Sequence, residues 1–353
     1  MTLDPKATPD ARIAAVQQQI ALLNKDRHPI LVGPFSSELG FEAIYWLPFL
    51  AWLKAKVTDF ETRARVITRG GAGALYTSVA AQGIDLYALR TVTEVRRAAL
   101  KQQRATGLQK QMAMTAFDQG VIESAAKSYG LHLPYHVVHP SLMYWAFEPY
   151  WTELGGLSYL KSLCDFALLP PPNPPPGVTL TLPEKFVAVK FYGRHTFPYP
   201  NPEIAEFVKR TVATIAAQVP VIALASSDAY DDHADIPIVG PNIVTIGETV
   251  DPTQNLWVAS AILARATAFV GTYGGMAQLA LRLGRPSLSF YQTWEGIGHA
   301  HFALNSWLSK TQTVPFLTGN LNDVFLWSQI TGLPTPHPAV VSDPQGGRVH
   351  ATP

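Results

Sequence analysis

A short glycine-bearing turn is the stretch of this chain whose residue types best suit chemistry. The turn GTYGG (271–275) follows an apolar run at 268–270 and precedes a helical pattern that ends near Leu283. Glycines at a strand-to-helix turn let a ligand approach the backbone, and the first amides of a helix bind phosphate. The turn is therefore a candidate anion site, with the Thr272 hydroxyl and the amides of Gly274 and Gly275 as donors. Tight packing at such a turn would require the same glycines.

Basic side chains follow a second apolar run, FVAVKFY (186–192), which reads as a strand. Lys190 lies within this run, and Arg194 and His195 come directly after it. The planar fork of an arginine suits phosphate, although a salt bridge within the loop is the alternative for Arg194. Because side chains alternate along a strand, Lys190 could point away from the ligand. His195 could transfer a proton or only form a local hydrogen bond.

Other polar residues follow strands and could reach the same ligand. Ser226 and Ser227 could bond a base or ribose, but serine at such a turn is more often a helix cap. Glu295 could accept both ribose hydroxyls. The remaining candidates on the 271–275 turn and its helix are Tyr273 and Gln278, of which Gln278 is as readily explained by packing.

Acidic residues lie in the loop GPFSSELGFE (33–42), which follows the first buried strand. Glu38 stands before Gly40 in the turn itself. Glu42 is explained as well by the helix dipole, because acids are favoured in the first turn of a helix. The acids at 228–235 have no recognised ligand spacing, so we predict a solvated loop there and no metal site.

Alternating apolar runs and helical patterns predict an α/β protein with parallel sheets. The predicted strands are 29–35, 64–70, 86–90, 132–139, 186–192, 220–226, 243–247, 268–270 and 287–291, and the predicted helices are 11–23, 41–56, 73–82, 111–130, 202–218, 255–266, 276–283, 300–308 and 321–330. Both halves read as doubly wound, Rossmann-like domains, whose ligands bind beyond the carboxyl ends of the strands.

A proline-rich segment at 170–177, PPPNPPPG, marks the boundary between the two halves, because it favours an extended spacer. We therefore expect an N-terminal domain at 1–169, a C-terminal domain at 178–333 and a flexible tail at 334–353. The two domains are expected to face each other across a cleft.

Composition narrows the function classes. A formal charge of +1 argues against a nucleic-acid binder, which needs a basic excess. The single cysteine, Cys164, excludes a disulfide framework, and no signal peptide or membrane-spanning run is predicted, so we expect a cytoplasmic protein.

A basic run at 90–110 is either a solvated helix face or a contact with an anionic membrane or acceptor. The aromatic cluster at 144–151 is read as core or domain interface, with sugar stacking as the alternative.

The run 255–291 resembles the sugar-nucleotide half of GT-B-fold glycosyltransferases, in their heptosyltransferase-like and fucosyltransferase-like branches. The loop at 33–42 resembles, more weakly, the first loop of the acceptor domain in the same superfamily, and FVAVKFYGRH (186–195) adds a third match. The resemblance implies transfer of a sugar from a nucleotide-diphosphate sugar to a carbohydrate or other hydroxyl acceptor. It also implies that Arg194 holds the donor pyrophosphate.

Retaining members commonly carry a pair of glutamates across the donor loop, and 272–278 contains none, so the resemblance implies an inverting enzyme. Inversion needs one general base, for which we prefer Glu38 over Glu42. We expect no metal and no cofactor, since Arg194 and the helix start would neutralise the leaving group. A sugar-nucleotide epimerase and a non-catalytic nucleotide- or carbohydrate-binding protein stay open as alternatives.

Overall fold

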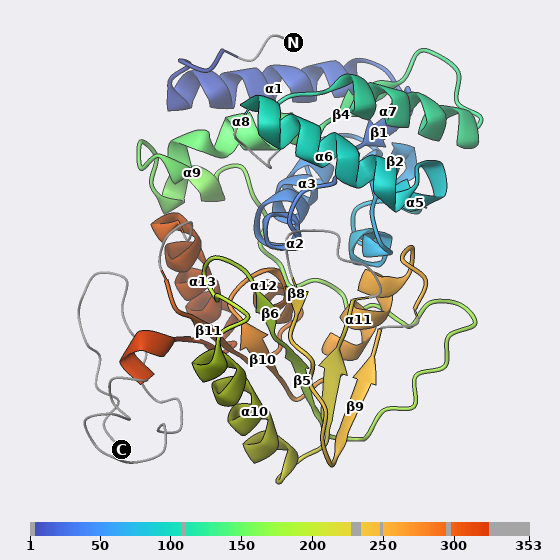
Figure 1. The fold of residues 1–353 in the computed structure, drawn as a ribbon. Coiled ribbons are helices and arrows are strands. Elements are labelled where there is room, and N and C mark those ends of the chain that lie inside the picture. The colour runs from blue at the N-terminus through green and yellow to red at the C-terminus, as the bar shows by residue number, and fades with distance from the viewer. Residues whose placement is uncertain (1–3, 107–110, 227–233, 248–249, 294–297, 325–353) are drawn as a thin grey trace. The chain divides into compact units, whose positions relative to one another are not determined.

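A computed structural model describes residues 4–106, 111–226, 234–247, 250–293 and 298–324 (Figure 1). The chain divides into two compact units. Unit 1 comprises Met1–Pro175 with Asp251–Val258, and unit 2 comprises Pro176–Val250 with Ala259–Pro353. The first change of unit thus falls inside the proline-rich segment at 170–177, and a short later segment returns to unit 1.

Unit 1 is built on a four-stranded parallel sheet with the strand order β3-β2-β1-β4. Its elements in chain order are α1 (Pro9–Lys25), β1 (Ile30–Val32), α2 (Leu39–Phe41), the π-helix η1 (Glu42–Trp46), α3 (Leu47–Lys54), α4 (Phe60–Arg63), β2 (Ala64–Thr68), the 3-10 helix η2 (Ala72–Tyr76), β3 (Gln82–Asp85), α5 (Leu86–Leu89), α6 (Val92–Thr106), α7 (Ala116–Ser128), β4 (His136–Val138), α8 (Pro140–Trp151) and α9 (Leu157–Lys161). Strands β1 to β3 extend the sheet in one direction and β4 lies on the other side of β1, so the switch point lies between β1 and β4.

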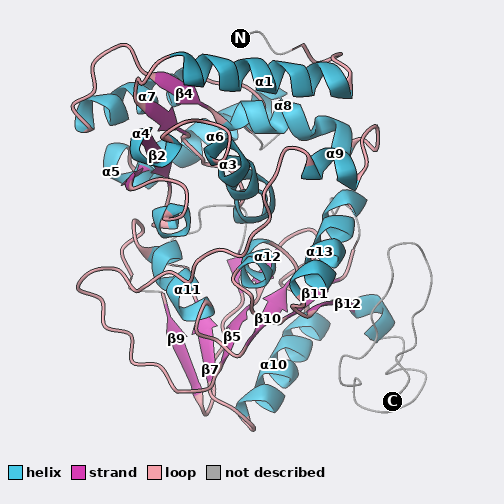
Figure 2. Cartoon of the chain, turned by 180° about the vertical axis from the view of Figure 1, so that it is seen from behind, coloured by secondary structure: helices cyan, strands magenta, loops and turns pink. Residues whose placement is uncertain are grey.

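Unit 2 is built on a six-stranded parallel sheet with the order β12-β11-β10-β5-β7-β9, seen from behind in Figure 2. Its elements are β5 (Val187–Lys190), β6 (Tyr192–Gly193), α10 (Pro202–Ala216), β7 (Val221–Leu224), β8 (Ala234–Asp235), β9 (Ile243–Ile246), β10 (Ala268–Thr272), α12 (Gly275–Arg282), β11 (Ser287–Tyr291), α13 (His299–Gln312) and β12 (Phe316–Asn320), while α11 (Asn255–Leu263) spans the division between the units. The chain fills one side of β5 first and the other side afterwards. The switch point therefore lies between β5 and β10.

The α/β prediction with parallel sheets in both halves is confirmed, and most predicted strands and helices are present within a few residues. The predicted strand at 86–90 is wrong, because Asp85 caps a helix there by accepting from the amide of Tyr87 at 2.9 Å. The predicted helix at 73–82 is the shorter 3-10 helix η2. Strand β12 was not predicted, and the predicted tail at 334–353 lies outside the described residues.

The aromatic cluster of α8 belongs to the core of unit 1, as the sequence predicted. Tyr144 and Phe147 are fully buried, and the Phe147 ring packs edge-on against Phe49 at 5.6 Å between centroids. In unit 2, Phe191, Phe207 and Phe290 occupy the core on one face of the sheet, with α10 packed over it. Each sheet is therefore a rigid base for the loops at its carboxyl edge.

Candidate functional site

The switch point of unit 2 brings together two of the loops predicted to bind a donor. β5 and β10 run parallel, with Gly271 opposite Lys190. Beyond them, the Thr272 hydroxyl accepts from the backbone N–H of Tyr192 at 3.0 Å and donates to the Tyr192 carbonyl at 3.1 Å. Thr272 is fully buried, so its hydroxyl joins the two loops to each other and is not available to a diphosphate, contrary to the prediction.

The glycines of this turn are required by neighbouring protein atoms. A Cβ on Gly271 would lie 2.0 Å from the Lys190 carbonyl oxygen, and a Cβ on Gly274 would lie 2.0 Å from the Tyr192 hydroxyl oxygen. Gly274 has an extended backbone with φ of 163°, so the Tyr192 hydroxyl alone demands glycine there. Packing, the alternative that the sequence left open, thus accounts for both glycines. Helix α12 begins at Gly275, and Gly274 has no side chain to cap its first amides, whose acceptor must come from elsewhere.

Arg194 lies two residues beyond Tyr192, in a turn where its backbone exchanges two hydrogen bonds of 3.0 Å with Phe197. Its guanidinium Nε is buried and has no hydrogen-bond partner within the described part of the chain. None of the ion pairs between described residues includes Arg194, so the salt-bridge alternative finds no support there. A buried donor without an acceptor costs about 1–3 kcal/mol, which an anionic ligand at this turn would recover.

Lys190 is held inside unit 2 by three protein acceptors. Its Nζ donates to the Asp235 carboxylate at 3.0 Å, to the Ser226 hydroxyl at 2.8 Å and to the Leu224 carbonyl at 3.2 Å. Burial lowers the pKa of Lys190, against the opposing effect of Asp235. Both side chains fasten the loop after β7 to β5, so Lys190 is not free for a phosphate, contrary to the prediction. Ser226 is exposed, and its nucleotide-binding role stays a prediction.

Two further predicted residues are packing residues. The ring of Tyr273 stacks on Phe302 at 4.6 Å, and its hydroxyl accepts from the amide of Asn305 at 3.1 Å. Gln278 is 6% exposed and bonds Tyr273, as its packing alternative implied. His195 is exposed, and its backbone carbonyl accepts from Thr293.

Ser227 and Glu295, the remaining predicted residues of unit 2, lie outside the described residues. Of the predicted donor-binding side chains that are described, His195 and Ser226 are exposed, and Arg194 has a buried Nε without a partner. The first amides of α12 lie at the same switch point.

At the carboxyl edge of the sheet in unit 1, Glu42 is fully buried in the π-helix that follows α2. Its Oε1 accepts from the Tyr76 hydroxyl at 2.5 Å, and its Oε2 has no partner among the described residues. Burial raises the pKa of Glu42 to about 7, while Arg69 and the Tyr76 hydrogen bond oppose the rise. Burial thus outweighs the helix-dipole effect that the sequence suggested for this acid.

Glu38 is the residue directly before α2. Its backbone is extended, and its side chain is half-buried. Its side chain makes no capping hydrogen bond, and no described residue forms an ion pair with it. Of the two predicted acids, Glu38 is thus the one whose carboxylate solvent or substrate can reach.

Other polar groups at this edge of the sheet were not predicted from the sequence. Arg69, just after β2, donates to the Ser37 carbonyl, and Tyr144 on α8 donates to the Ser37 hydroxyl at 2.7 Å. Asp85, at the end of β3, accepts from the amide of Gly71 at 2.7 Å. The rule that loops after parallel strands carry function points to Arg69 and Asp85 once β2 and β3 are placed correctly.

Within the basic segment at 90–110, residues Val92–Thr106 form α6, with Arg96, Arg97 and Lys101 exposed along it, and 107–110 lie outside the described residues. Arg90 instead donates to the Gly120 carbonyl and the Ser124 hydroxyl, both at 2.9 Å, so it is a structural residue. Among the described residues, no helix has the length and apolar character needed to cross a membrane.

Comparison with known proteins gives no match to a family model and none to a curated protein. Three solved structures illustrate what the chain is similar to. A family 9 glycosyl transferase from Veillonella parvula is 11% identical over 88% of this chain and 90% of its own, with a TM-score of 0.45. An iron-containing dodecameric glycosyltransferase from enterotoxigenic E. coli is 14% identical over 74% of this chain, with a TM-score of 0.38, and the match spans 58% of its length. A UDP-N-acetylglucosamine 2-epimerase is 11% identical over 86% of this chain and 87% of its own, with a TM-score of 0.35.

Glycosyltransferases of the kind that the loop resemblance indicates, heptosyltransferases among them, are thus prominent among the similar structures. Likeness at this level carries no argument about substrate or reaction, which must be inferred from the chain's own residues.

Proposed function

We propose that the protein is a glycosyltransferase that moves a sugar from a nucleotide-diphosphate sugar to a hydroxyl acceptor, with inversion and without a metal ion in the reaction. The donor diphosphate binds at the switch point of unit 2. The general base comes from the carboxyl edge of unit 1.

The observation that carries this proposal is the guanidinium of Arg194. It lies beside the β5–β10 switch point, its Nε is buried, and no described residue satisfies it. A diphosphate offers the charged, bidentate acceptor that suits an arginine. The first amides of α12 add donors at the same point, so two independent features favour an anion there.

Glu38 is the proposed general base. It takes the proton of the acceptor hydroxyl as the oxygen bonds to the anomeric carbon, and the bond from that carbon to the diphosphate oxygen breaks. Arg194 and the α12 amides stabilise the charge that develops on the leaving diphosphate. Glu42 is sealed from solvent, so we assign it to holding the Tyr76 hydroxyl.

Incubation with a panel of nucleotide sugars, without an added acceptor, tests the proposal. The wild-type protein should hydrolyse its own donor slowly, because water then replaces the acceptor. E38Q should lower this turnover about 10²- to 10⁴-fold, the usual share of a general base, with the KM for the donor unchanged. The matched control is E123Q, which removes an exposed carboxylate of unit 1 on α7 and should leave turnover unchanged.

The other outcomes separate the alternatives. Release of an epimeric sugar nucleotide would make the protein an epimerase, and binding without turnover would make it a binding protein. Equal turnover in E38Q and wild type would remove Glu38 from the mechanism.

The exposed basic face of α6 suits an anionic acceptor, such as a lipid-linked one, and peripheral membrane contact is proposed on that ground. Sedimentation with anionic and neutral vesicles checks this, and a salt-sensitive preference for the anionic vesicles is the expected result.

A further inference from the structure

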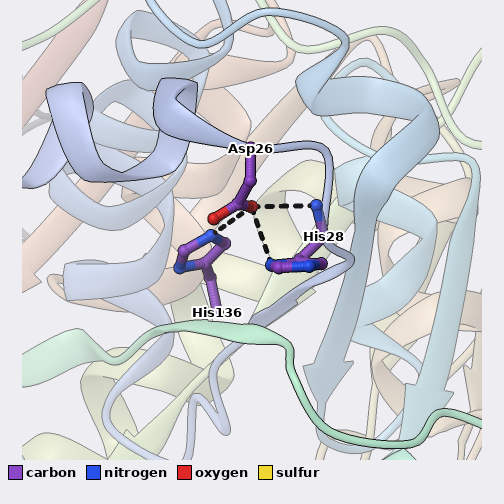
Figure 3. Close-up of side chains that lie close together, drawn as sticks. All are labelled: Asp26, His28 and His136. Carbon is purple, nitrogen blue, oxygen red and sulfur yellow. Dashed lines mark hydrogen bonds and ion pairs between the residues drawn. The ribbon is translucent and has the colours of Figure 1, made fainter.

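Three potential metal ligands converge in unit 1 at the end of the sheet opposite to Glu38. Asp26 follows α1, His28 precedes β1 by two residues, and His136 is the first residue of β4 (Figure 3). They therefore lie at the amino ends of the strands, whereas Glu38 follows the carboxyl end of β1. Among the described residues, these side chains bring their ligand atoms within 4.8 Å of one another.

The side chains already point toward one centre. His28 Nδ1 lies 2.9 Å from Asp26 Oδ1, and His136 Nε2 lies 2.8 Å from the same oxygen. The backbone N–H of His28 donates to that oxygen as well, at 3.0 Å. Figure 3 shows both rings directed at the carboxylate.

The backbone that carries these ligands is fixed by the sheet. β1 pairs with β4 with Ile30 opposite His136, and the amide of His136 donates to the Pro29 carbonyl at 2.9 Å. The guanidinium of Arg63 binds the His28 carbonyl at 3.0 Å and the Leu23 carbonyl at 2.9 Å. Both the strand ends and the turn between α1 and β1 are thus held in place.

Charge and access favour a cation at this centre. The side chains of His28, Asp26 and His136 are 41%, 32% and 22% exposed, so an ion can enter from solvent. Two cations flank Asp26 on the chain: Arg27 forms an ion pair with Asp59 at 2.9 Å, and Lys25 is exposed to solvent. The positive charge of Arg63 lies nearby but is bonded to backbone carbonyls.

We propose that Asp26, His28 and His136 bind a divalent first-row transition metal ion, with Zn²⁺ as the reference case. Two imidazoles and one carboxylate are borderline ligands that suit Zn²⁺, Co²⁺ and Ni²⁺ better than Mg²⁺ or Ca²⁺. Water completes the coordination. Each ring would bind the ion through the nitrogen that now bonds Oδ1, with the proton of the neutral ring on its other nitrogen.

The two nitrogen–oxygen distances require only a small adjustment. Ligand bonds of about 2.0–2.2 Å at tetrahedral angles place donor atoms roughly 3.3 Å apart. The nitrogen–oxygen distances of 2.8 and 2.9 Å must therefore open by about half an ångström. Rotation of partly exposed side chains supplies that movement.

The ion would join the turn between α1 and β1 to β4, which lies more than one hundred residues further along the chain. Because it binds the folded unit and not the unfolded chain, it would stabilise unit 1 by RT ln(1 + L/Kd), where L is the free metal concentration. This site is separate from the proposed transfer reaction, so its failure would leave that proposal untouched.

Metal titration of the full-length protein, with any affinity tag removed and after dialysis against a chelator, tests the site. Calorimetry with Zn²⁺ should give one ion per chain, and Co²⁺ should give the visible absorption of a low-symmetry site. D26N and H136Q should each weaken Zn²⁺ binding at least about 100-fold, more than outer contacts of metal sites usually contribute. The matched control is H132Q, an exposed histidine four residues from His136, which should bind Zn²⁺ as wild type does.

The Co²⁺ spectrum is read on the wild-type protein, so it decides the matter even if a variant folds poorly. Absence of a stoichiometric ion and of the Co²⁺ absorption would overturn the site. Equal Zn²⁺ binding by D26N and wild type would also overturn it.

Discussion

Replacing Glu42 by glutamine should change how the stability of unit 1 depends on pH. The pKa of Glu42 is about 7 in the folded protein, against 4.5 for an ordinary glutamate. Because the folded-state pKa is the higher one, folding favours the protonated carboxyl. The stabilising contribution is therefore complete below pH 4.5 and is lost as pH rises through 7. Glutamine is neutral at every pH and removes this dependence.

The size of the effect follows from the shift. One pKa unit corresponds to about 1.36 kcal/mol. A shift from 4.5 to about 7 makes the free energy of unfolding of the wild type fall by about 2 to 3 kcal/mol, relative to E42Q, between pH 5 and pH 8. Because Glu42 is fully buried, solvent does not screen its charge, and the whole pKa shift contributes to the free energy of unfolding.

Urea unfolding of wild type and E42Q at a series of pH values measures this difference. Subtracting the two proteins at each pH cancels every titration that they share. The matched control is E38Q, which removes the same charge from the same segment but from a half-exposed side chain.

A stability difference between wild type and E42Q that stays constant from pH 5 to pH 8 would refute the reasoning. It would mean that the carboxyl of Glu42 reaches water or a cation as freely in the folded chain as in the unfolded one. A difference that changes equally in E38Q would assign the effect to net charge.

Two further predictions concern the switch point of unit 2, each read by urea unfolding. G274A should destabilise by about 1–3 kcal/mol, and Y192F should rescue it, because the nearest ring atom is then 3.4 Å from the new Cβ. G271A should not be rescued, since its Cβ meets the backbone oxygen of Lys190; equal rescue of both would contradict this. T272V should cost about 1–3 kcal/mol by leaving the Tyr192 amide unbonded, T272S should cost less, and a neutral T272V would contradict the two hydrogen bonds.

The sequence predicted the fold well because the central strands of both sheets, β1 and β2 in unit 1 and β5, β7, β10 and β11 in unit 2, are mostly buried and apolar and stand out from helical patterns. It failed at 86–90, where the four apolar residues Leu86–Leu89 are too few to show a periodicity and the cap from Asp85 favours a helix. β12 was missed because Phe316–Asn320 ends in threonine, glycine and asparagine and is a strand only by pairing with β11. Tertiary pairing, which local pattern does not show, thus fixed β12.

The candidate site was harder to predict, because side-chain partners decide which polar residues are available. Thr272 and Gly274 stand where a phosphate-binding turn would have them, yet Tyr192 explains both. Lys190 meets Asp235, a residue forty-five positions away along the chain. Arg194 differs from them only in lacking such a partner among the described residues.

Binding of nucleoside diphosphates tests the central claim most directly, namely that Arg194 at the switch point of unit 2 holds a diphosphate. Calorimetry with uridine, guanosine, cytidine, thymidine and adenosine diphosphates should find one that binds the wild type more tightly than its monophosphate. R194A should weaken that diphosphate about tenfold to a hundredfold, the range of a charge-assisted hydrogen bond. R210A, which removes an exposed arginine paired with Glu206 on α10, should bind as wild type does. Undiminished diphosphate binding by R194A, or no diphosphate binding by the wild type, would contradict the account.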